Sequence, residues 1–303
     1  MRKHLNTIIC AIDFSDYSRH TLSYGIAFAR VFDAHLFVAH VIDLPSASMY
    51  GEAFFPVEEQ KERVMAYAQE EISRLIGDQS VRWEALISHG HTADEIARMA
   101  EEKDANLVIA ATYGRSGLKR LVLGSVTERL MQTLSCPLLV VRSPEHDFVS
   151  PTGREISLNR ILVGCDFSSD SLLALQYGLS LAQEFEAELH LVHVIEPPVY
   201  RDLVRPEGKK AEEYQTTLQE RLNRKLAEMV PEEARFWCVP KSTLLAGQPH
   251  EELTKYAVVQ NIDLIVLGVH GRGLVEGLLV GSTTDRVIRE GPCPVLSVRP
   301  TKD

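Results

Sequence analysis

The feature that most constrains this chain is an internal repeat. The apolar run that ends in Asp13 returns 153 residues later as the run that ends in Asp166, and each is followed by Phe and Ser. The segment LFVAHVI at 36–42 returns at the same offset as LHLVHVI at 189–195. Such paired segments in the same order indicate that the chain contains two copies of one unit.

The offset grows along the repeat. The segments that begin at Leu123 and Cys136 return 157 residues later, at Val280 and Cys293, so the second copy has gained four residues in its middle. A period near 155 residues lies far above the roughly 20–50 residues of solenoid repeats. The repeat therefore predicts a duplicated domain.

The length and one linker-like stretch place the two domains. A chain of 303 residues is long enough for two domains of ordinary size. The stretch from Ser143 to Ser157 contains two prolines, a glycine and mixed charges, which is typical of a linker. We predict one domain at 1–145 and a second at 156–303.

Each copy alternates strand-like and helix-like patterns, β-α-β-α-β-α-β-α-β. The runs 107–110 and 264–267 are almost continuously apolar, as is typical of strands buried on both faces of a parallel sheet. Ser15 and Ser168 follow the first strand of each copy and are candidate caps for the next helix. The second helix of the first copy has an apolar stripe at Val64, Ala68, Ile72 and Leu75. This alternation predicts a doubly wound α/β sheet in each domain.

Charge, cysteines and apolar runs exclude several classes. A net charge of −10 argues against nucleic acid as the main partner, although backbone amides can still hold a small anion. Five cysteines without a CxxC pair predict free thiols in a reducing compartment. No apolar run approaches the length of a membrane span, and the first residues lack the apolar core of a signal peptide. We expect a cytoplasmic protein that binds neither membranes nor nucleic acid.

The candidate site lies where the strand order of such a sheet reverses. Ligands bind there beyond the carboxyl ends of the strands. Asp13 and Asp166 close the first strand of each copy, and their carboxylates can accept hydrogen bonds from a base or a ribose. After the fourth strand of the second copy come Gly268 and Gly271, then nine residues, then Gly281 at an expected helix start. Glycine amides and a helix N-terminus together suit a polyphosphate.

This pattern resembles the universal stress proteins, and the resemblance covers nearly the whole chain, twice. It carries the strand-Asp-Phe-Ser segment, the His-Val-Ile of the second strand, Gly-x2-Gly-x9-Gly-Ser, and the last Cys-Pro-apolar strand. The resemblance implies Rossmann-like domains of the adenine-nucleotide alpha hydrolase type, each with four helices and a five-stranded parallel sheet of order 3-2-1-4-5. It also implies a pseudo-twofold arrangement in which the last strands, 138–141 and 295–298, pair within one chain. Further homodimerisation stays open.

The resemblance further implies binding of ATP or AMP, with ADP and Mg²⁺ also open. In the second domain it assigns the nucleotide to eleven positions: Cys165, Asp166, Val194, Leu267, Gly268, His270, Gly271, Arg272, Gly281, Ser282 and Thr283. In the first domain it assigns Asp13, Val41, Gly114, Gly124 and Ser125. Ala111 and Tyr113 replace Gly268 and His270 in the first copy. We therefore expect the second domain to be the better site and the first to be degraded or altered.

Other interpretations of single residues stay beside these. Asp13 and Asp166 also suit simple turns that start a helix. His40 and His193 are expected to be packed or hydrogen-bonded strand-end residues, and His89-Gly90-His91 is a weak metal motif. The apolar loop residues 54–56 and 197–200 are read as loop anchors, with a second ligand pocket as the alternative.

Three functions remain in competition. The first is a nucleotide-responsive stress-response regulator without catalysis. The second is a slow ATP hydrolase, or a protein that phosphorylates itself at Ser282 or Thr283. The third is a nucleotide-free scaffold or chaperone-like module. The chain lacks a Walker loop and an evident acidic pair for Mg²⁺, which favours the first.

Overall fold

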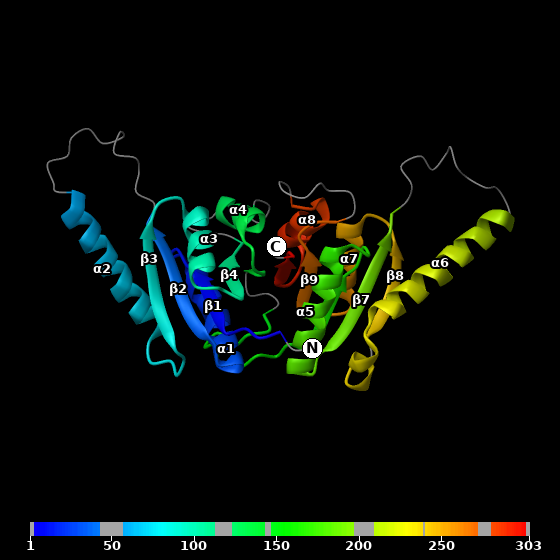
Figure 1. Cartoon of the computed structure of the whole chain (residues 1–303), viewed down its shortest axis with the longest axis horizontal. Coiled ribbons are helices and arrows are strands. Elements are labelled where there is room, and N and C mark those ends of the chain that lie inside the picture. Colours follow the sequence, from blue (N-terminus) through cyan, green and yellow to red (C-terminus); the bar gives the residue numbers. More distant parts are fainter. Residues whose placement is uncertain are drawn as a thin grey trace. The chain divides into compact units, whose positions relative to one another are not determined.

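A computed structural model describes residues 3–42, 57–112, 123–142, 147–196, 209–238, 240–271 and 280–300 (Figure 1). The chain forms two compact units, built mainly from His4–Ile156 and Ser157–Pro300 and called domain 1 and domain 2 below. Each domain is described by itself.

Domain 1 contains five strands and four helices among its described residues. In chain order they are β1 (Thr7–Ala11), α1 (Asp16–Phe32), β2 (His35–Ile42), α2 (Val57–Ile76), β3 (Trp83–His89), α3 (Thr92–Glu102), β4 (Leu107–Ala111), α4 (Ser125–Thr133) and β5 (Leu138–Val141). All strand pairs are parallel, and the strand order is β3-β2-β1-β4-β5. This is the predicted 3-2-1-4-5 order.

Domain 2 repeats this arrangement. Its elements are β6 (Arg160–Gly164), α5 (Ser169–Phe185), β7 (Glu188–Ile195), α6 (Lys209–Met229), the short 3₁₀ helix η3 (Glu232–Phe236), β8 (Lys241–Ala246), α7 (Pro249–Val259), β9 (Leu264–Gly268), α8 (Ser282–Glu290) and β10 (Val295–Val298). The strands are parallel in the order β8-β7-β6-β9-β10. The predicted α/β fold with two tandem Rossmann-like domains is confirmed.

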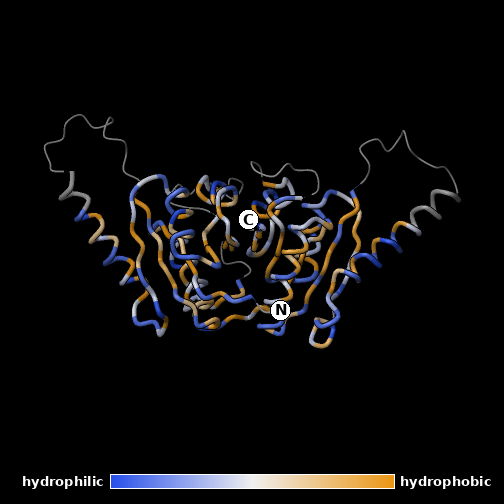
Figure 2. The backbone as a smooth tube through the Cα atoms, in the orientation of Figure 1, coloured by the Kyte–Doolittle hydropathy of each residue, from blue (hydrophilic) through white to orange (hydrophobic). Residues whose placement is uncertain are grey.

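The sheets supply the core of each domain. Ile8, Ile9 and Val108 are fully buried in domain 1, as are Ile161 and Leu264 in domain 2. Figure 2 shows hydrophobic residues running along the strands. Helix α1 packs against β1, β2 and β4, while α3 packs against α4 and against β2 and β3. Both faces of the central strands are therefore covered, which explains their continuously apolar sequences.

The two first helices begin differently from one another. Ser168 is the N-cap of α5, and its hydroxyl accepts a hydrogen bond from the Ser171 amide, as predicted. Ser15 holds the N-cap position of α1, but its side chain makes no capping bond, and its buried hydroxyl has no partner in the described part of the chain. The predicted side-chain cap at Ser15 is wrong: the Ser18 amide donates to the Ser15 carbonyl oxygen at 2.9 Å, and the Ser18 hydroxyl donates to Asp13.

Residues that follow the first domain's last strand pack back onto α1. The Tyr24 hydroxyl donates to Asp147 at 3.0 Å, and the Tyr24 and Phe148 rings meet edge to face at 5.0 Å. Gly153 has a φ of +65° and lies against the backbone of α1, where its carbonyl accepts a hydrogen bond from Arg30. These contacts make the compact unit run to Ile156.

The structure bears on two expectations that concern the cysteines and the helices. All five cysteines lie in the described ranges, and none of them forms a disulfide. Across the described helices, none combines the length and the apolar character that crossing a membrane requires.

Candidate functional site

A cavity of about 560 Å³ opens at the carboxyl ends of β1 and β4 in domain 1. Its size falls within the roughly 300–1,000 Å³ of small-molecule sites. Four of the five residues predicted for this domain line it: Asp13, Val41, Gly124 and Ser125. The fifth, Gly114, lies outside the described residues. Further lining residues that the sequence did not single out include Ser18, Thr21, Tyr67, Thr92, Thr112 and Thr127.

The first strand ends in the same local geometry in both domains. Phe14 and Phe167, which follow the two aspartates, have φ values of +59° and +64°. A bulky residue in this left-handed region is unusual, and such strain gathers at functional sites. The Phe14 ring lies 4.3 Å from the His40 ring, and the Phe167 ring lies 4.6 Å from the His193 ring.

Hydrogen bonds fix both aspartates. Asp13 Oδ1 accepts from the Ser15 amide and from the Ser18 hydroxyl, each at 3.0 Å. Asp166 Oδ1 accepts from the amide and the hydroxyl of Ser168, at 3.0 and 2.5 Å. The turn interpretation is therefore correct for the Oδ1 atoms, and the same bonds hold each carboxylate at the strand edge.

The strand histidines are hydrogen-bonded, as expected. Nδ1 of His40 lies 3.0 Å from the carbonyl oxygen of Ile12, and Nδ1 of His193 lies 2.7 Å from that of Cys165. Within the described ranges, no group of three or more His, Cys, Asp or Glu residues is placed to hold a metal ion.

The start of the fourth helix is pinned to the end of the fourth strand. In domain 1 the Gly124 amide donates to Thr112 at 2.9 Å, and the Thr127 hydroxyl donates to Ala111 at 2.7 Å. In domain 2 Gly281 and Thr284 make the same bonds to Val269 and Gly268, at 2.8 and 2.7 Å. The first-turn amides, which have no partner within their helix, therefore stand at the strand edge, where an anion is favoured.

Domain 2 brings several of its predicted residues together. A Cβ added to Gly271 would lie 3.0 Å from Asp166 Oδ2, and one added to Gly281 would lie 3.9 Å from the Cα of His270. Ser282 and Thr283 are the first two residues of α8, Cys165 follows β6, Val194 lies in β7 and Leu267 lies in β9. Arg272 lies outside the described residues.

Gly268 has a structural reason to be glycine. A Cβ at this position would lie 2.5 Å from the Asp170 Cβ and 2.8 Å from the Asp170 carbonyl carbon. The close approach of α5 therefore demands glycine here, independently of any ligand. In domain 1 the corresponding residues are Ala111 and Tyr17.

Asp170 is a site-edge residue that sequence reasoning missed. It is buried, and its Oδ2 accepts a hydrogen bond from the His270 amide at 3.0 Å and lies 3.2 Å from His270 Nδ1. The charge of Asp170 also acts on Arg299, whose pKa is lowered chiefly by burial and is partly restored by this carboxylate. The repeat carries no signal for Asp170, because the first copy has Tyr17 at this position.

Comparison with known proteins identifies the family of the chain. The model of the universal stress protein family matches residues 4–142 and 157–299. A universal stress protein of Mycolicibacterium smegmatis is 26% identical over 314 residues, which is 97% of each chain. One from Mycobacterium tuberculosis H37Rv is 27% identical over 302 residues and 96% of each chain. The crystal structure of a universal stress protein from Archaeoglobus fulgidus has a TM-score of 0.70 at 22% identity, covering 98% of this chain and 99% of its own, and it shows the same fold. With both halves matched by one family model, the chain belongs to the universal stress protein family and carries two tandem domains of it.

Proposed function

We propose that this protein binds an adenine nucleotide, ATP or AMP, at the carboxyl edge of each domain's sheet and acts as a nucleotide-responsive regulator in the stress response. The observation that carries the proposal is the domain 1 cavity, which joins Asp13 to the N-terminus of α4. A regulator of this kind needs binding that shifts a conformation or an affinity, and it needs no chemical step.

The lining of the cavity suits the parts of a nucleotide. Val41, Ile42 and Ile96 offer apolar surface for a base. Asp13 offers a carboxylate at the neighbouring strand end for base or ribose groups. Gly124 and Ser125 open α4, whose first-turn amides favour phosphate oxygens.

Domain 2 supports a second site. Asp166, Gly271 and Gly281 lie together there, on a strand edge and a helix start built like those of domain 1. Since Gly268 is explained by packing, the higher rank that the sequence gives domain 2 now depends on His270, which replaces Tyr113. We propose two sites per chain, with domain 2 the tighter one.

Matched serine variants test the proposal. Ser125 and Ser282 are exposed residues at the first position of α4 and α8. Ser125→Asp and Ser282→Asp each add a carboxylate that the helix dipole tolerates but that repels phosphate. We expect each variant to weaken ATP binding at its own site by roughly tenfold or more, measured by calorimetry. The double variant should lose the thermal shift that ATP gives the parent.

Asparagine variants at the same two positions are the control. Ser125→Asn and Ser282→Asn keep the size of aspartate without its charge, so they should bind nearly as the parent does. If ATP, ADP and AMP neither shift the melting temperature of the parent nor give binding heat, the proposed function is wrong. Both measurements are made on the full chain.

A further inference from the structure

One wall of the domain 1 cavity is formed by helix α2. This helix packs against β3, the strand at the outer edge of the domain's sheet (Figure 1). Three of its residues line the cavity: Val64, Tyr67 and Ala68. Ala68 is buried, whereas Val64 is 41% exposed and Tyr67 is 61% exposed. An aliphatic side chain and an aromatic ring therefore stand at the rim of the cavity.

This wall lies at the opposite end of the cavity from the expected phosphates. The strand order β3-β2-β1-β4 places α2 beyond β2, whereas α4 begins beside the end of β4. Asp13, at the end of β1, lies between the two ends. Val41 and Ile42, which offer apolar surface for a base, belong to β2 and so lie on the α2 side. A nucleotide whose phosphates meet α4 therefore presents its base to α2.

Tyr67 is the aromatic ring of this wall that has surface to offer. Phe14 also lines the cavity, but its ring already lies 4.3 Å from the His40 ring. Tyrosine suits a rim, because its ring can cover an apolar face of a ligand while its hydroxyl stays in water. A nucleic acid base stacks favourably on such a ring.

The matching helix of domain 2 has a different residue at this place. The buried stripe that contains Ile72 in α2 corresponds to the stripe that contains Leu226 in α6, an offset of 154 residues. At this offset, Tyr67 corresponds to Arg221. Domain 2 therefore has a guanidinium group where domain 1 has an aromatic ring.

Lys225, one turn after Arg221, shows which way this face of α6 points. Its ammonium lies 4.3 Å from the centre of the Phe167 ring, and Phe167 follows Asp166 at the strand end. Residues four apart share one face of a helix, so Arg221 belongs to the same face. The counterpart of Phe14, which lines the cavity of domain 1, thus lies under a cation in domain 2. Positive charge here suits an anion better than an apolar base.

We propose that Tyr67 is the base-stacking residue of domain 1. The α2 wall makes this site depend chiefly on the base of the nucleotide, whereas the basic face of α6 makes the site of domain 2 depend chiefly on the phosphates. The two domains thus select different parts of one ligand class. The inference deepens the proposed function and rests on it.

Calorimetric titrations with ATP and with ribose 5-triphosphate test the inference. The two ligands share the ribose and the three phosphates, so the ratio of their dissociation constants isolates the base. A Ser282→Asp protein reports domain 1, and a Ser125→Asp protein reports domain 2. We expect ATP to be preferred at least about fivefold more strongly in domain 1 than in domain 2. An equal preference in the two domains, or a stronger one in domain 2, overturns the inference.

Variants of α2 assign the preference to one ring. In the Ser282→Asp protein, Tyr67→Ala should weaken ATP binding roughly tenfold and leave ribose 5-triphosphate within about twofold. Tyr67→Phe restores the ring and should recover most of the lost ATP affinity. Met65→Ala is the matched control, because Met65 is 38% exposed on the same helix and is not among the described residues that line the cavity. It should change the binding of neither ligand.

The outcomes separate the inference from the proposed function. Because Tyr67 is largely exposed, Tyr67→Ala should leave the urea midpoint unchanged, so a loss of ATP affinity reports on binding. Unchanged ATP binding in Tyr67→Ala, or an equal loss of both ligands, overturns the inference and leaves the proposed function standing. Absence of ATP binding in the unsubstituted protein overturns the proposed function and the inference with it.

Discussion

Domain 1 and domain 2 share a backbone frame and differ in what fills it. Both end their first strand in Asp-Phe with a left-handed phenylalanine, and both tie the fourth helix to the fourth strand through the same two bonds. Behind this frame the two copies differ in sequence: Ala111 of domain 1 corresponds to Gly268 of domain 2, and Tyr17 corresponds to Asp170. The two domains therefore share the backbone geometry of the candidate site, while the packing behind it differs.

The packing changes are paired. Leu267 of domain 2 reaches so close to Gly164 that a Cβ there would lie 2.4 Å from its Cδ2. At the matching positions, domain 1 has Ala11 and Ala110, which share the volume more evenly and line the cavity. A glycine present in only one copy therefore need not mark a ligand, because a neighbouring side chain can be the reason for it.

The largest predicted loss of stability comes from exchanging the residues at the end of the fourth strand between the two domains. Gly268→Ala puts a Cβ 2.5 Å from Asp170 and against its backbone, and should cost domain 2 about 3 kcal/mol of unfolding free energy. The reverse change in domain 1, Ala111→Gly, should cost about 0.5–1 kcal/mol. Urea unfolding followed by circular dichroism compares them. Similar costs in the two domains would refute the packing explanation of Gly268.

A smaller effect separates the two helix starts. Ser168→Ala removes a hydroxyl that caps α5 and donates to Asp166, and should cost about 1 kcal/mol. Ser15→Ala removes a buried hydroxyl that has no partner among the described residues, and should leave stability within about 0.5 kcal/mol of the parent. The readout is the urea midpoint of each variant, and a larger loss from Ser15→Ala than from Ser168→Ala would contradict this assignment.

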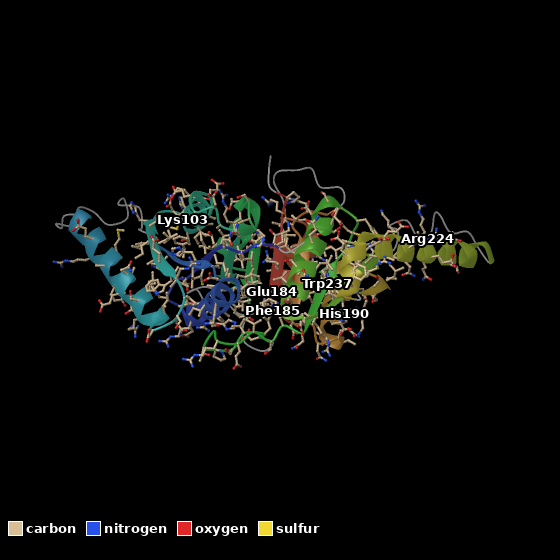
Figure 3. The ribbon with its side chains drawn as sticks, turned by 60° about the horizontal axis from the view of Figure 1, so that its bottom comes forward. Lys103, Glu184, Phe185, His190, Arg224 and Trp237 are labelled. Carbon is tan, nitrogen blue, oxygen red and sulfur yellow. The ribbon has the colours of Figure 1, made fainter. Side chains whose placement is uncertain are left out.

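The smallest effect concerns the other end of the sheets. His190 on β7, labelled in Figure 3, is 1% exposed, and its Nδ1 lies 2.9 Å from the Tyr256 hydroxyl. Its counterpart in domain 1 is Phe37, whose ring lies under the Lys103 ammonium. Burial lowers the pKa of His190, so the unfolded chain binds this proton first and stability falls as the pH drops below about 6.5.

Replacing this histidine with its counterpart removes that dependence. His190→Phe should show a smaller loss of melting temperature than the parent between pH 7.5 and pH 5. The reverse change, Phe37→His, should make the loss steeper in domain 1. Thermal unfolding monitored by circular dichroism at the two pH values provides the comparison, and an unaltered pH dependence in His190→Phe would show that His190 contributes none of it.

The sequence predicts the frame well and the contents of the site less well. The alternation of patterns predicts a doubly wound parallel sheet, because parallel strands need crossover helices that leave periodic patterns. The strand order itself is what the family resemblance implies. Asp13, Gly124 and Ser125 are found at the cavity because they sit at strand and helix ends, which are visible in sequence.

What the sequence missed depends on distances between elements. The Asp170–His270 pair joins residues 100 positions apart, and the need for glycine at 268 arises from the approach of α5. Val64 belongs to the predicted apolar stripe of its helix, but it is 41% exposed and lines the cavity. Of the same stripe, Ala68 and Ile72 are buried. Volumes and close approaches of this kind are set by packing, not by the local pattern.

The central claim is that both domains, although packed differently, hold an adenine nucleotide at the same edge. Calorimetric titration of the full chain with ATP tests it most directly through the stoichiometry. We predict close to two molecules per chain, with the tighter one lost in Ser282→Asp and the weaker one lost in Ser125→Asp. A stoichiometry of zero, or a single site that survives both substitutions, would contradict the account.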